Sequence, residues 1–335
     1  MGNDFDTMVE QHQVTWRKQH IPYPDTGRQN GLTREWILPH DRWMDGIWPR
    51  IRQELASYLA ATGVQPHRGV HNLKSSWVLC ANLYFAARQD KQLLADFLHE
   101  TVSPEIETVD QIELEYAEEG DLAPSKLLGE PQGVRGANQT SPDVAFIVNG
   151  GRGLILTENK FTEHSFYECS GRNPKYGNPD RNRCLNLADV LGNPHQICFQ
   201  THWAEDRRTN RRYWDYLQIT EYGREHLRHC PAALGGYQLF RQQALAEGIA
   251  KSGKYDFVYS CVAYDARYET LITSLKSAGI PDFRIGWGQL FSGKAKFASF
   301  SHQQWTTWVR QYNSNNQWTD WLKYINLRYG FIIKG

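Results

Sequence analysis

The stretch that decides the fold is SPDVAFIVNGGRGLILTENK, residues 141–160. Two apolar runs of strand length flank Gly150 and Gly151, and glycine accepts the positive φ that a tight hairpin turn requires. The pattern therefore predicts an antiparallel β-hairpin. Charged residues also stand at the end far from the turn, where packing of an apolar core does not explain them: Asp143, Glu158 and Lys160.

The two glycines predict which residues face each other. If they form a two-residue turn, the numbers of paired residues sum to 301, and Asp143 lies directly opposite Glu158. Opposed residues project from one face of the hairpin, with Cβ atoms about 5 Å apart. Lys160 shares that face because side chains alternate along a strand. One additional loop residue would shift the register and put the two carboxylates on opposite faces. The same face carries four apolar side chains, Ala145, Ile147, Leu154 and Leu156.

The charged end of the hairpin has the groups needed for metal-dependent chemistry. Two opposed carboxylates repel each other unless a cation lies between them, and Mg²⁺ or Mn²⁺ binds a few carboxylate oxygens while keeping water and phosphate oxygens as ligands. Such a metal lowers the pKa of a bound water. Lys160 can orient that water or stabilise charge on a phosphate. We therefore expect hydrolysis of phosphodiesters; the alternative is a surface hairpin with a solvated ion pair.

The residues SPD at 141–143 and ENK at 158–160 are similar to the PD-(D/E)XK motif of the restriction-endonuclease-like nucleases. The segments HNLKSSWVLCANLYF (71–85) and YQLFRQQALA (237–246) also look like segments of bacterial proteins classed as restriction endonucleases. The resemblance covers roughly residues 70–270. It implies an α/β fold with a mixed central sheet flanked by helices. In this family a helix and then a further strand follow the hairpin, and the predicted helix after Gly236 and the predicted strand YDFVYSCVAYD (255–265) have this order. The resemblance also implies Asp143 and Glu158 as ligands of Mg²⁺ or Mn²⁺, Lys160 as a catalytic residue and DNA as substrate.

The resemblance implies two further site residues. Members of the superfamily often add an acidic metal ligand from the first helix or strand. The alternation in DQIELEYAEE (110–119) predicts a half-buried strand with an acidic face, on which Glu115 is the predicted ligand; Glu113 and Glu54 are the other candidates. On the helix that begins after Gly236, Gln238 is predicted to contact the water or the phosphate. Solvated strand and helix surfaces are the competing interpretation.

Four of the six cysteines lie in one irregular insertion at about 161–233: Cys169, Cys184, Cys198 and Cys230. Without a secretory signal, disulfides are not expected. The four thiols lack the short C-x₂₋₄-C spacing of zinc knuckles. Some superfamily members hold a [4Fe–4S] cluster with four distant cysteines, so the insertion is predicted to hold either such a cluster or Zn²⁺. Alternative zinc ligands are His195, His202, His226 and His229, and unligated reduced thiols are the other possibility.

Basic residues in the same insertion alternate with asparagine and aromatic residues. Such segments can contact phosphates and stack on bases, although solvated loops have a similar composition. The residues predicted to contact DNA are Arg172, Lys175, Arg207, Arg208, Arg211 and Arg212.

The composition sets limits on the class of protein. The 335 residues include 37 acidic and 37 basic side chains, so the total charge shows no footprint of nucleic acid or membrane. The chain has neither a signal-peptide pattern nor a run long enough to span a bilayer, and we expect a cytoplasmic protein. The expected organisation is an N-terminal arm and helix (1–69), a nuclease core with the insertion (70–270), and a C-terminal helical and strand extension packed on the core (271–335).

Local patterns predict further elements. Residues 1–40 are expected to form an irregular arm, and helices are expected near 43–62, 74–88, 91–102, 301–312 and 317–328. FRIGWGQLF (283–291) is predicted as a strand. Together with these patterns, the resemblance to the PD-(D/E)XK nucleases implies a metal-dependent DNA endonuclease for restriction, defence or DNA processing. A homodimer is expected if duplex DNA is cleaved by one active site per chain. The alternative is a catalytically inactive subunit that binds nucleic acid or serves assembly.

Overall fold

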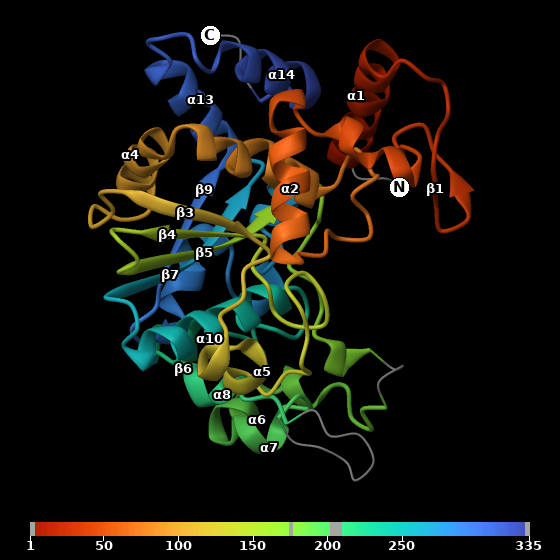
Figure 1. Cartoon of the computed structure of the whole chain (residues 1–335). Coiled ribbons are helices and arrows are strands. Elements are labelled where there is room, and N and C mark those ends of the chain that lie inside the picture. The colour runs from red at the N-terminus through yellow and green to blue at the C-terminus, as the bar shows by residue number, and fades with distance from the viewer. Residues whose placement is uncertain (1–3, 174–176, 202–209, 332–335) are drawn as a thin grey trace.

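A mixed five-stranded sheet forms the centre of the computed structural model, which describes residues 4–173, 177–201 and 210–331 (Figure 1). The strand order is β3-β4-β5-β7-β9; β3, β4 and β5 are antiparallel neighbours, whereas β7 and β9 extend the sheet in parallel. The strands are β3 (Val109–Leu114), β4 (Val144–Val148), β5 (Gly153–Lys160), β7 (Phe257–Tyr264) and β9 (Lys296–Ser301). The predicted α/β class with a mixed central sheet is confirmed.

The β4–β5 hairpin has the predicted register. Val144 pairs with Thr157 and Val148 with Gly153, so paired residue numbers sum to 301. The turn is longer than predicted and comprises residues 149–152. Because the loop gains one residue from each strand, the register is unchanged. Asn149, Gly150 and Gly151 all have positive φ, at 56°, 67° and 81°.

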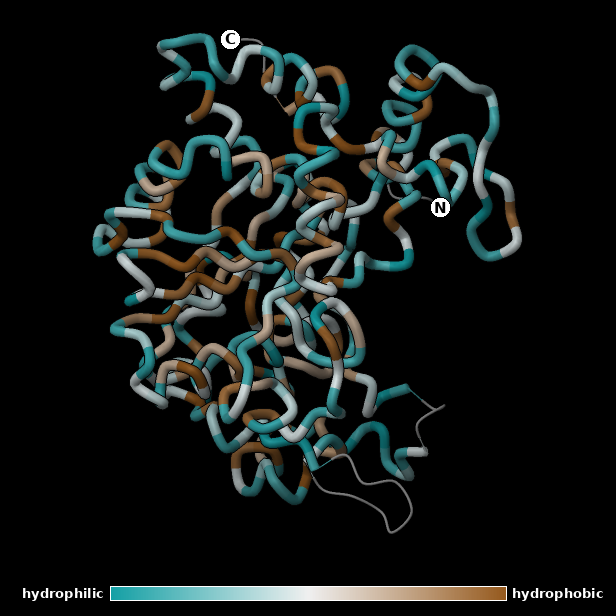
Figure 2. The backbone as a smooth tube through the Cα atoms, in the orientation of Figure 1, coloured by the Kyte–Doolittle hydropathy of each residue, from teal (hydrophilic) through white to brown (hydrophobic). Residues whose placement is uncertain are grey.

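The inner strands are apolar because both of their faces are covered. Every residue of β5 is buried, and seven of the eight residues of β7 are buried; parallel strands covered on both faces read as continuous apolar runs. Figure 2 shows hydrophobic residues concentrated along these strands. Gln242 of α10 (Tyr237–Ser252) fixes this helix to the sheet, because its Nε2 donates to the carbonyls of Leu156 (3.1 Å) and Cys261 (2.9 Å).

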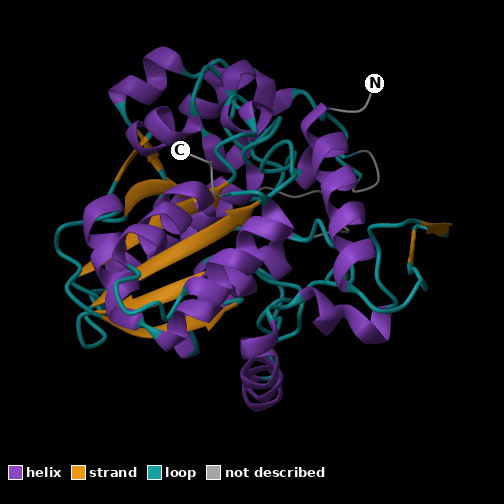
Figure 3. Cartoon of the chain, turned by 90° about the horizontal axis from the view of Figure 1, so that it is seen from above, coloured by secondary structure: helices purple, strands orange, loops and turns teal. Residues whose placement is uncertain are grey.

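Helices cover both faces of the sheet (Figures 1 and 3). α4 and α13 pack on one side against β9, while α10 packs on the other side against β5 and β7. α4 spans Lys91–Thr101 and α13 spans His302–Tyr312. The other α-helices of the described residues are α1 (Asp4–His20), α2 (Arg52–Thr62), α3 (Ser76–Cys80), α5 (Pro124–Leu127), α6 (Leu187–Gly192), α7 (Pro194–Ile197), α8 (Tyr213–Tyr216), α9 (Glu221–His226), α11 (Glu269–Ile272), α12 (Phe283–Gly286) and α14 (Thr319–Tyr329). Two small sheets pair β1 (Arg28–Gln29) with β2 (Leu32–Thr33) and β6 (Gln218–Ile219) with β8 (Phe291–Ser292). No helix in the described ranges is both long enough and apolar enough to cross a membrane.

Two predicted elements are wrong. Much of the expected arm at 1–40 is α1, whose buried residues include Phe5, Val9 and Trp16, at the spacing of one helix face. The expected strand at 283–291 begins instead with α12, which Asp282 caps by accepting the backbone N–H of Arg284 (2.8 Å). The fifth strand of the sheet, β9, was not predicted.

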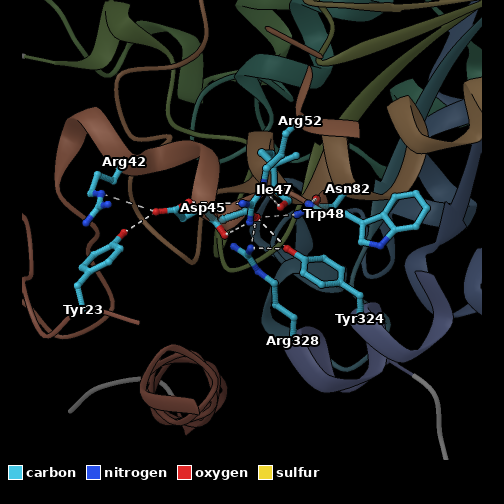
Figure 4. Close-up of polar contacts among 10 residues, drawn as sticks. Tyr23, Arg42, Asp45, Ile47, Trp48, Arg52, Asn82, Tyr324 and Arg328 are labelled. Carbon is cyan, nitrogen blue, oxygen red and sulfur yellow. Dashed lines mark hydrogen bonds and ion pairs between the residues drawn. The ribbon is translucent and has the colours of Figure 1, made fainter. Parts of the chain in front are cut away.

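Segments that are far apart in the sequence meet around the backbone carbonyl of Gly46, and Figure 4 shows Asn82, Tyr324 and Arg328 pointing toward the segment between Asp45 and Ile47. Asn82 (3.1 Å), Tyr324 (3.0 Å) and Arg328 all donate hydrogen bonds to this carbonyl. Asn82 also accepts the backbone N–H of Trp48 at 2.7 Å. α14 supplies Tyr324 and Arg328 and packs against α1. The N-terminal and C-terminal helices are therefore tied to each other.

Candidate active site

The charged end of the hairpin forms a closed set of hydrogen bonds. Lys160 donates its Nζ to Oε1 of Glu158 (2.9 Å) and to Oε1 of Gln238 (2.8 Å). Gln238, near the start of α10, donates its Nε2 to the same oxygen of Glu158 (2.8 Å). The structure thus brings together three of the predicted site residues from β5 and α10.

Asp143, the residue directly before β4, lies at the same end of the hairpin. Its Oδ2 accepts the backbone N–H of Asn159 at 2.7 Å. Burial raises the pKa of Asp143 well above its usual range, and the nearby carboxylate of Glu158 raises it further. The carboxylate of Glu158 therefore lies close enough to disfavour the ionised form of Asp143, as the predicted register requires.

Glu115 lies beside these two carboxylates, immediately after β3. Its backbone N–H donates to the carbonyl of Asp143 (3.0 Å), and only 7% of the residue is exposed. Burial raises the pKa of Glu115 well above its usual range, and the charges of Asp143 and Glu158 add to this increase. Its φ of 47° is unusual for a residue with a side chain, and such backbone strain is concentrated at functional sites.

The other acidic candidates point elsewhere. Glu113 accepts hydrogen bonds from Tyr58 (3.0 Å) and Arg135 (2.9 Å). Glu54 is exposed on α2 and pairs with Arg88 at 3.6 Å. Of the three acidic candidates, Glu115 is therefore the one that lies beside Asp143 and Glu158.

Lys160 is buried among these acids, with 3% of its side chain exposed. Burial alone lowers the pKa of a lysine, but the carboxylates of Glu158, Glu163 and Asp143 outweigh this effect and raise the pKa of Lys160. The amine is therefore protonated at neutral pH. Glu163 was missed by the sequence analysis; its Oε2 accepts the backbone N–H of Phe161 at 2.8 Å.

His302 supports the backbone of Lys160 from the start of α13. Its Nε2 donates to the carbonyl of Lys160 (2.9 Å), and its Nδ1 contacts the hydroxyl of Tyr84 (2.9 Å). Because a carbonyl only accepts, the Nε2 carries the proton and the Tyr84 hydroxyl donates to Nδ1. Burial lowers the pKa of His302 to about 4, so the ring is neutral at pH 7. The sequence carries no signal for this contact, because the two residues are 142 positions apart.

An aromatic residue stands beside the lysine. The ring centroid of Tyr167 lies 5.4 Å from Nζ of Lys160, and Tyr167 is 50% exposed with a φ of 59°. Its carbonyl accepts the backbone N–H of Tyr237 at 3.1 Å, which holds it near the start of α10. The sequence analysis did not single out this residue.

A cleft of about 120 Å³ opens next to the cluster. Arg241 contributes to its wall and donates its Nε to Glu130 (3.1 Å) and to the hydroxyl of Thr140 (3.0 Å). The residues that line the cleft are Gln139, Thr140, Ser141, Glu158, Gln238, Arg241 and Gln242.

The donor set fits a cation held by two carboxylates. In the described ranges, no group of three or more His, Cys, Asp or Glu side chains is placed to hold a metal ion, so Glu115 does not complete a three-carboxylate site. Mg²⁺ needs only one or two protein carboxylates, with water and phosphate oxygens as its other ligands. Asp143 and Glu158 each use one carboxylate oxygen in the hydrogen bonds above. Among the described residues, their second oxygens accept none, which leaves them available to a cation.

The four cysteines of the insertion are free thiols that line one cavity: Cys169, Cys184, Cys198 and Cys230. As they stand, these thiols do not form a metal centre within the described part of the chain. His195 lies near Asp215, His226 contacts the carbonyl of Tyr222, and His229 contacts that of Cys230. His202 lies outside the described residues.

Three of the six predicted DNA-contacting residues lie in the described ranges, and each of these donates hydrogen bonds within the chain. Lys175, Arg207 and Arg208 lie outside the described residues. Arg172 donates to Glu168 (2.9 Å) and to the carbonyl of Arg181 (2.8 Å). Arg211 donates to the carbonyl of Gly129 (2.5 Å), and Arg212 to Asp215 (2.8 Å). Their role in DNA binding stays a prediction.

A model of a known protein family matches nearly the whole of this chain. The family model described as "Restriction Endonuclease associating with ARP" matches residues 10–330. The chain matches no curated protein and no solved structure.

Proposed function

Because the chain belongs to the family described as Restriction Endonuclease associating with ARP, we propose that it is a DNA endonuclease that depends on Mg²⁺ or Mn²⁺. The observation that carries the proposal is the acidic cluster at the end of the hairpin. Asp143 and Glu115 have raised pKa values beside a protonated lysine, and a cation bound to the carboxylates would offset the repulsion between their ionised forms. The mixed sheet and α10 supply the core that a PD-(D/E)XK nuclease needs.

Each residue has a distinct role in the proposed reaction. Asp143 and Glu158 would hold the metal, which when bound lowers the pKa of a water and stabilises negative charge on oxygen. Lys160 keeps a positive charge next to Glu158, where it can orient the attacking water or stabilise the phosphate in the transition state. Gln238 fixes both side chains through its two hydrogen bonds.

The adjoining cleft is the proposed place for a phosphate group of the DNA. Its wall includes Arg241, Thr140 and Ser141, which supply a cation and two hydroxyl groups. Arginine is suited to phosphate because its guanidinium presents several donors in a fixed plane. The scissile or a neighbouring phosphate would then lie next to Glu158.

The proposed partners follow from the family and from the reaction. The family description names association with ARP, and we propose the corresponding protein as a partner of this chain. DNA is the proposed substrate, and a homodimer would supply two active sites for a duplex. The biological setting would be restriction, defence or DNA processing.

A plasmid-cleavage assay tests the proposal, performed with and without the ARP partner. Wild-type protein is expected to nick or linearise DNA with Mg²⁺ and not with EDTA. Asp143→Asn and Lys160→Met are expected to lose the activity, whereas Glu54→Gln, a change to an exposed carboxylate, keeps it. Cleavage that survives both site variants would disprove the assigned site. A wild-type protein that binds DNA but never cleaves it would instead support an inactive assembly subunit.

A further inference from the structure

The four cysteines of the insertion converge although they are distant in sequence. Cys169 and Cys230 are separated by sixty-one positions, yet both contribute to the wall of the cavity that Cys184 and Cys198 also line. The cavity has a volume of about 20 Å³. The two remaining thiols, Cys80 and Cys261, lie on α3 and β7 and do not line it.

Backbone hydrogen bonds already hold these segments together. The N–H of Cys169 donates to the carbonyl of Ala232 (3.1 Å), and the N–H of Cys230 donates to the carbonyl of Cys184 (3.0 Å). The side chain of Gln200, two residues after Cys198, donates to the hydroxyl of Ser170 (2.9 Å). The chain therefore places all four cysteines in one neighbourhood without help from a disulfide.

We propose that Cys169, Cys184, Cys198 and Cys230 bind one zinc ion that organises the insertion. Four thiolates form a closed tetrahedral site typical of structural zinc, with Zn–S distances of about 2.3 Å. The cavity is comparable in size to about one water molecule, which suits a single ion better than a cluster of four irons and four sulfides. His195, His226 and His229 do not line the cavity, so the ligand set is cysteine alone among the described residues.

Formation of the site requires small movements of side chains. The thiols do not surround one point in their present rotamers. A cysteine Sγ moves by roughly 3 Å between staggered χ1 rotamers, which is comparable to the dimensions of the cavity. Binding would release the thiol protons to solvent, because zinc binds the thiolate. Arg172 would offset part of the net negative charge of a zinc ion with four thiolates.

A bound zinc ion would stabilise the fold of the insertion, whose regular elements are short. Its described regular elements are short: α6 and α9 have six residues each, and α7 and α8 have four. Metal binding supplies folding free energy to segments whose own core is small. The zinc site would thereby fix the segment that lies beside Tyr237 and the start of α10.

Metal analysis of the full-length protein tests the proposal. Protein purified without chelator is expected to contain about one zinc per chain and negligible iron. Cys198→Ser is expected to lose most of this zinc, whereas Cys261→Ala, which removes a buried thiol from β7, keeps it. Asp143→Asn should also keep it, so that the outcome is independent of the proposed nuclease site.

A second measurement covers the case in which Cys198→Ser does not fold. Wild-type protein stripped of zinc is titrated with Co²⁺, and the expected result is the visible absorption of tetrahedral cobalt thiolate at one equivalent. Zinc-free wild-type protein that shows no thiolate–cobalt absorption would overturn the proposal. Stoichiometric iron with a brown colour would overturn it as well, in favour of a cluster.

Discussion

Asp143→Asn is expected to stabilise the protein in the absence of metal, although it removes a proposed catalytic ligand. The asparagine Oδ1 can still accept the N–H of Asn159, so the hydrogen bond of the native residue is retained. What is lost is one negative charge from the cluster with Glu158 and Glu115. The pKa of Asp143 is raised in the folded protein, so its ionised form disfavours folding. This penalty is absent below the pKa of the unfolded chain and grows as the pH rises through the folded pKa, so the effect is largest at alkaline pH.

The magnitude follows from the geometry of the hairpin. Two unit charges about 5 Å apart repel by ~3 kcal/mol at an effective dielectric constant of about 20. Lys160 offsets part of this repulsion, so we expect a gain of roughly 1–2 kcal/mol in the free energy of unfolding. For 335 residues, 1 kcal/mol corresponds to about 1.4 °C in Tm, so the expected increase is roughly 1.5–3 °C.

Thermal unfolding at pH 8 measures both the stability of Asp143→Asn without metal and the effect of Mg²⁺ on Tm. In EDTA, Asp143→Asn should unfold at a higher temperature than wild type, while the exposed change Asp121→Asn should leave Tm unchanged. With Mg²⁺, the wild type should gain Tm because a ligand that binds only the folded state stabilises it. The variant should show little or no gain. A variant less stable than wild type in EDTA, combined with no effect of Mg²⁺ on wild type, would refute the assignment of a cation site.

Three further results are expected from the same site. Lys160→Met should lower the cleavage rate by roughly 10²–10³-fold, which is the loss typical of a removed electrostatic stabiliser. The increase of Tm by Mg²⁺ should persist in this variant. If that increase is lost, the lysine takes part in metal binding instead. Gln238→Ala should reduce cleavage about tenfold with little loss of stability. Gln242→Ala should cost roughly 2–4 kcal/mol in urea unfolding, because it removes the buried amide whose two N–H groups are shared among Leu156, Ser260 and Cys261. The reverse pattern would contradict the assigned roles. Cleavage should rise with pH, because the pKa of Asp143 is raised and its carboxyl must lose a proton before it binds a cation, and higher Mg²⁺ should shift the rise to lower pH. A pH profile that does not move with Mg²⁺ would argue against metal-linked ionisation.

The hairpin was predictable because its signals are local. Alternation with a period of two assigns each side chain to a face, and the glycines place the turn. The actual turn is two residues longer than predicted, but the extension is symmetric and the register stayed correct. Asp143, Glu158 and Lys160 were therefore placed on one face from the sequence alone.

The supporting contacts were not predictable, because they join segments distant in sequence. His302 contacts the carbonyl of Lys160 across 142 positions, and β9 pairs with β7 although its own sequence, KFASFS, has a weak apolar pattern. Glu163 and Tyr167 follow Lys160 closely in sequence, but no periodicity marks the irregular segment that carries them. α1 was missed for a different reason: its apolar positions are sparse among polar residues, although their spacing is helical.

The late position of β9 has a consequence for the order in which this protein matures during synthesis. Lys160 is translated long before His302, so its carbonyl acquires the His302 partner only after residue 302 has left the ribosome. The edge strand beside β7 is completed at Ser301. The hydrogen bonds from Tyr324 and Arg328 to the Gly46 carbonyl form later still. Nascent chains that end before β9 therefore lack part of the central sheet and the support of the lysine. The site is therefore assembled only after residue 302 has been translated.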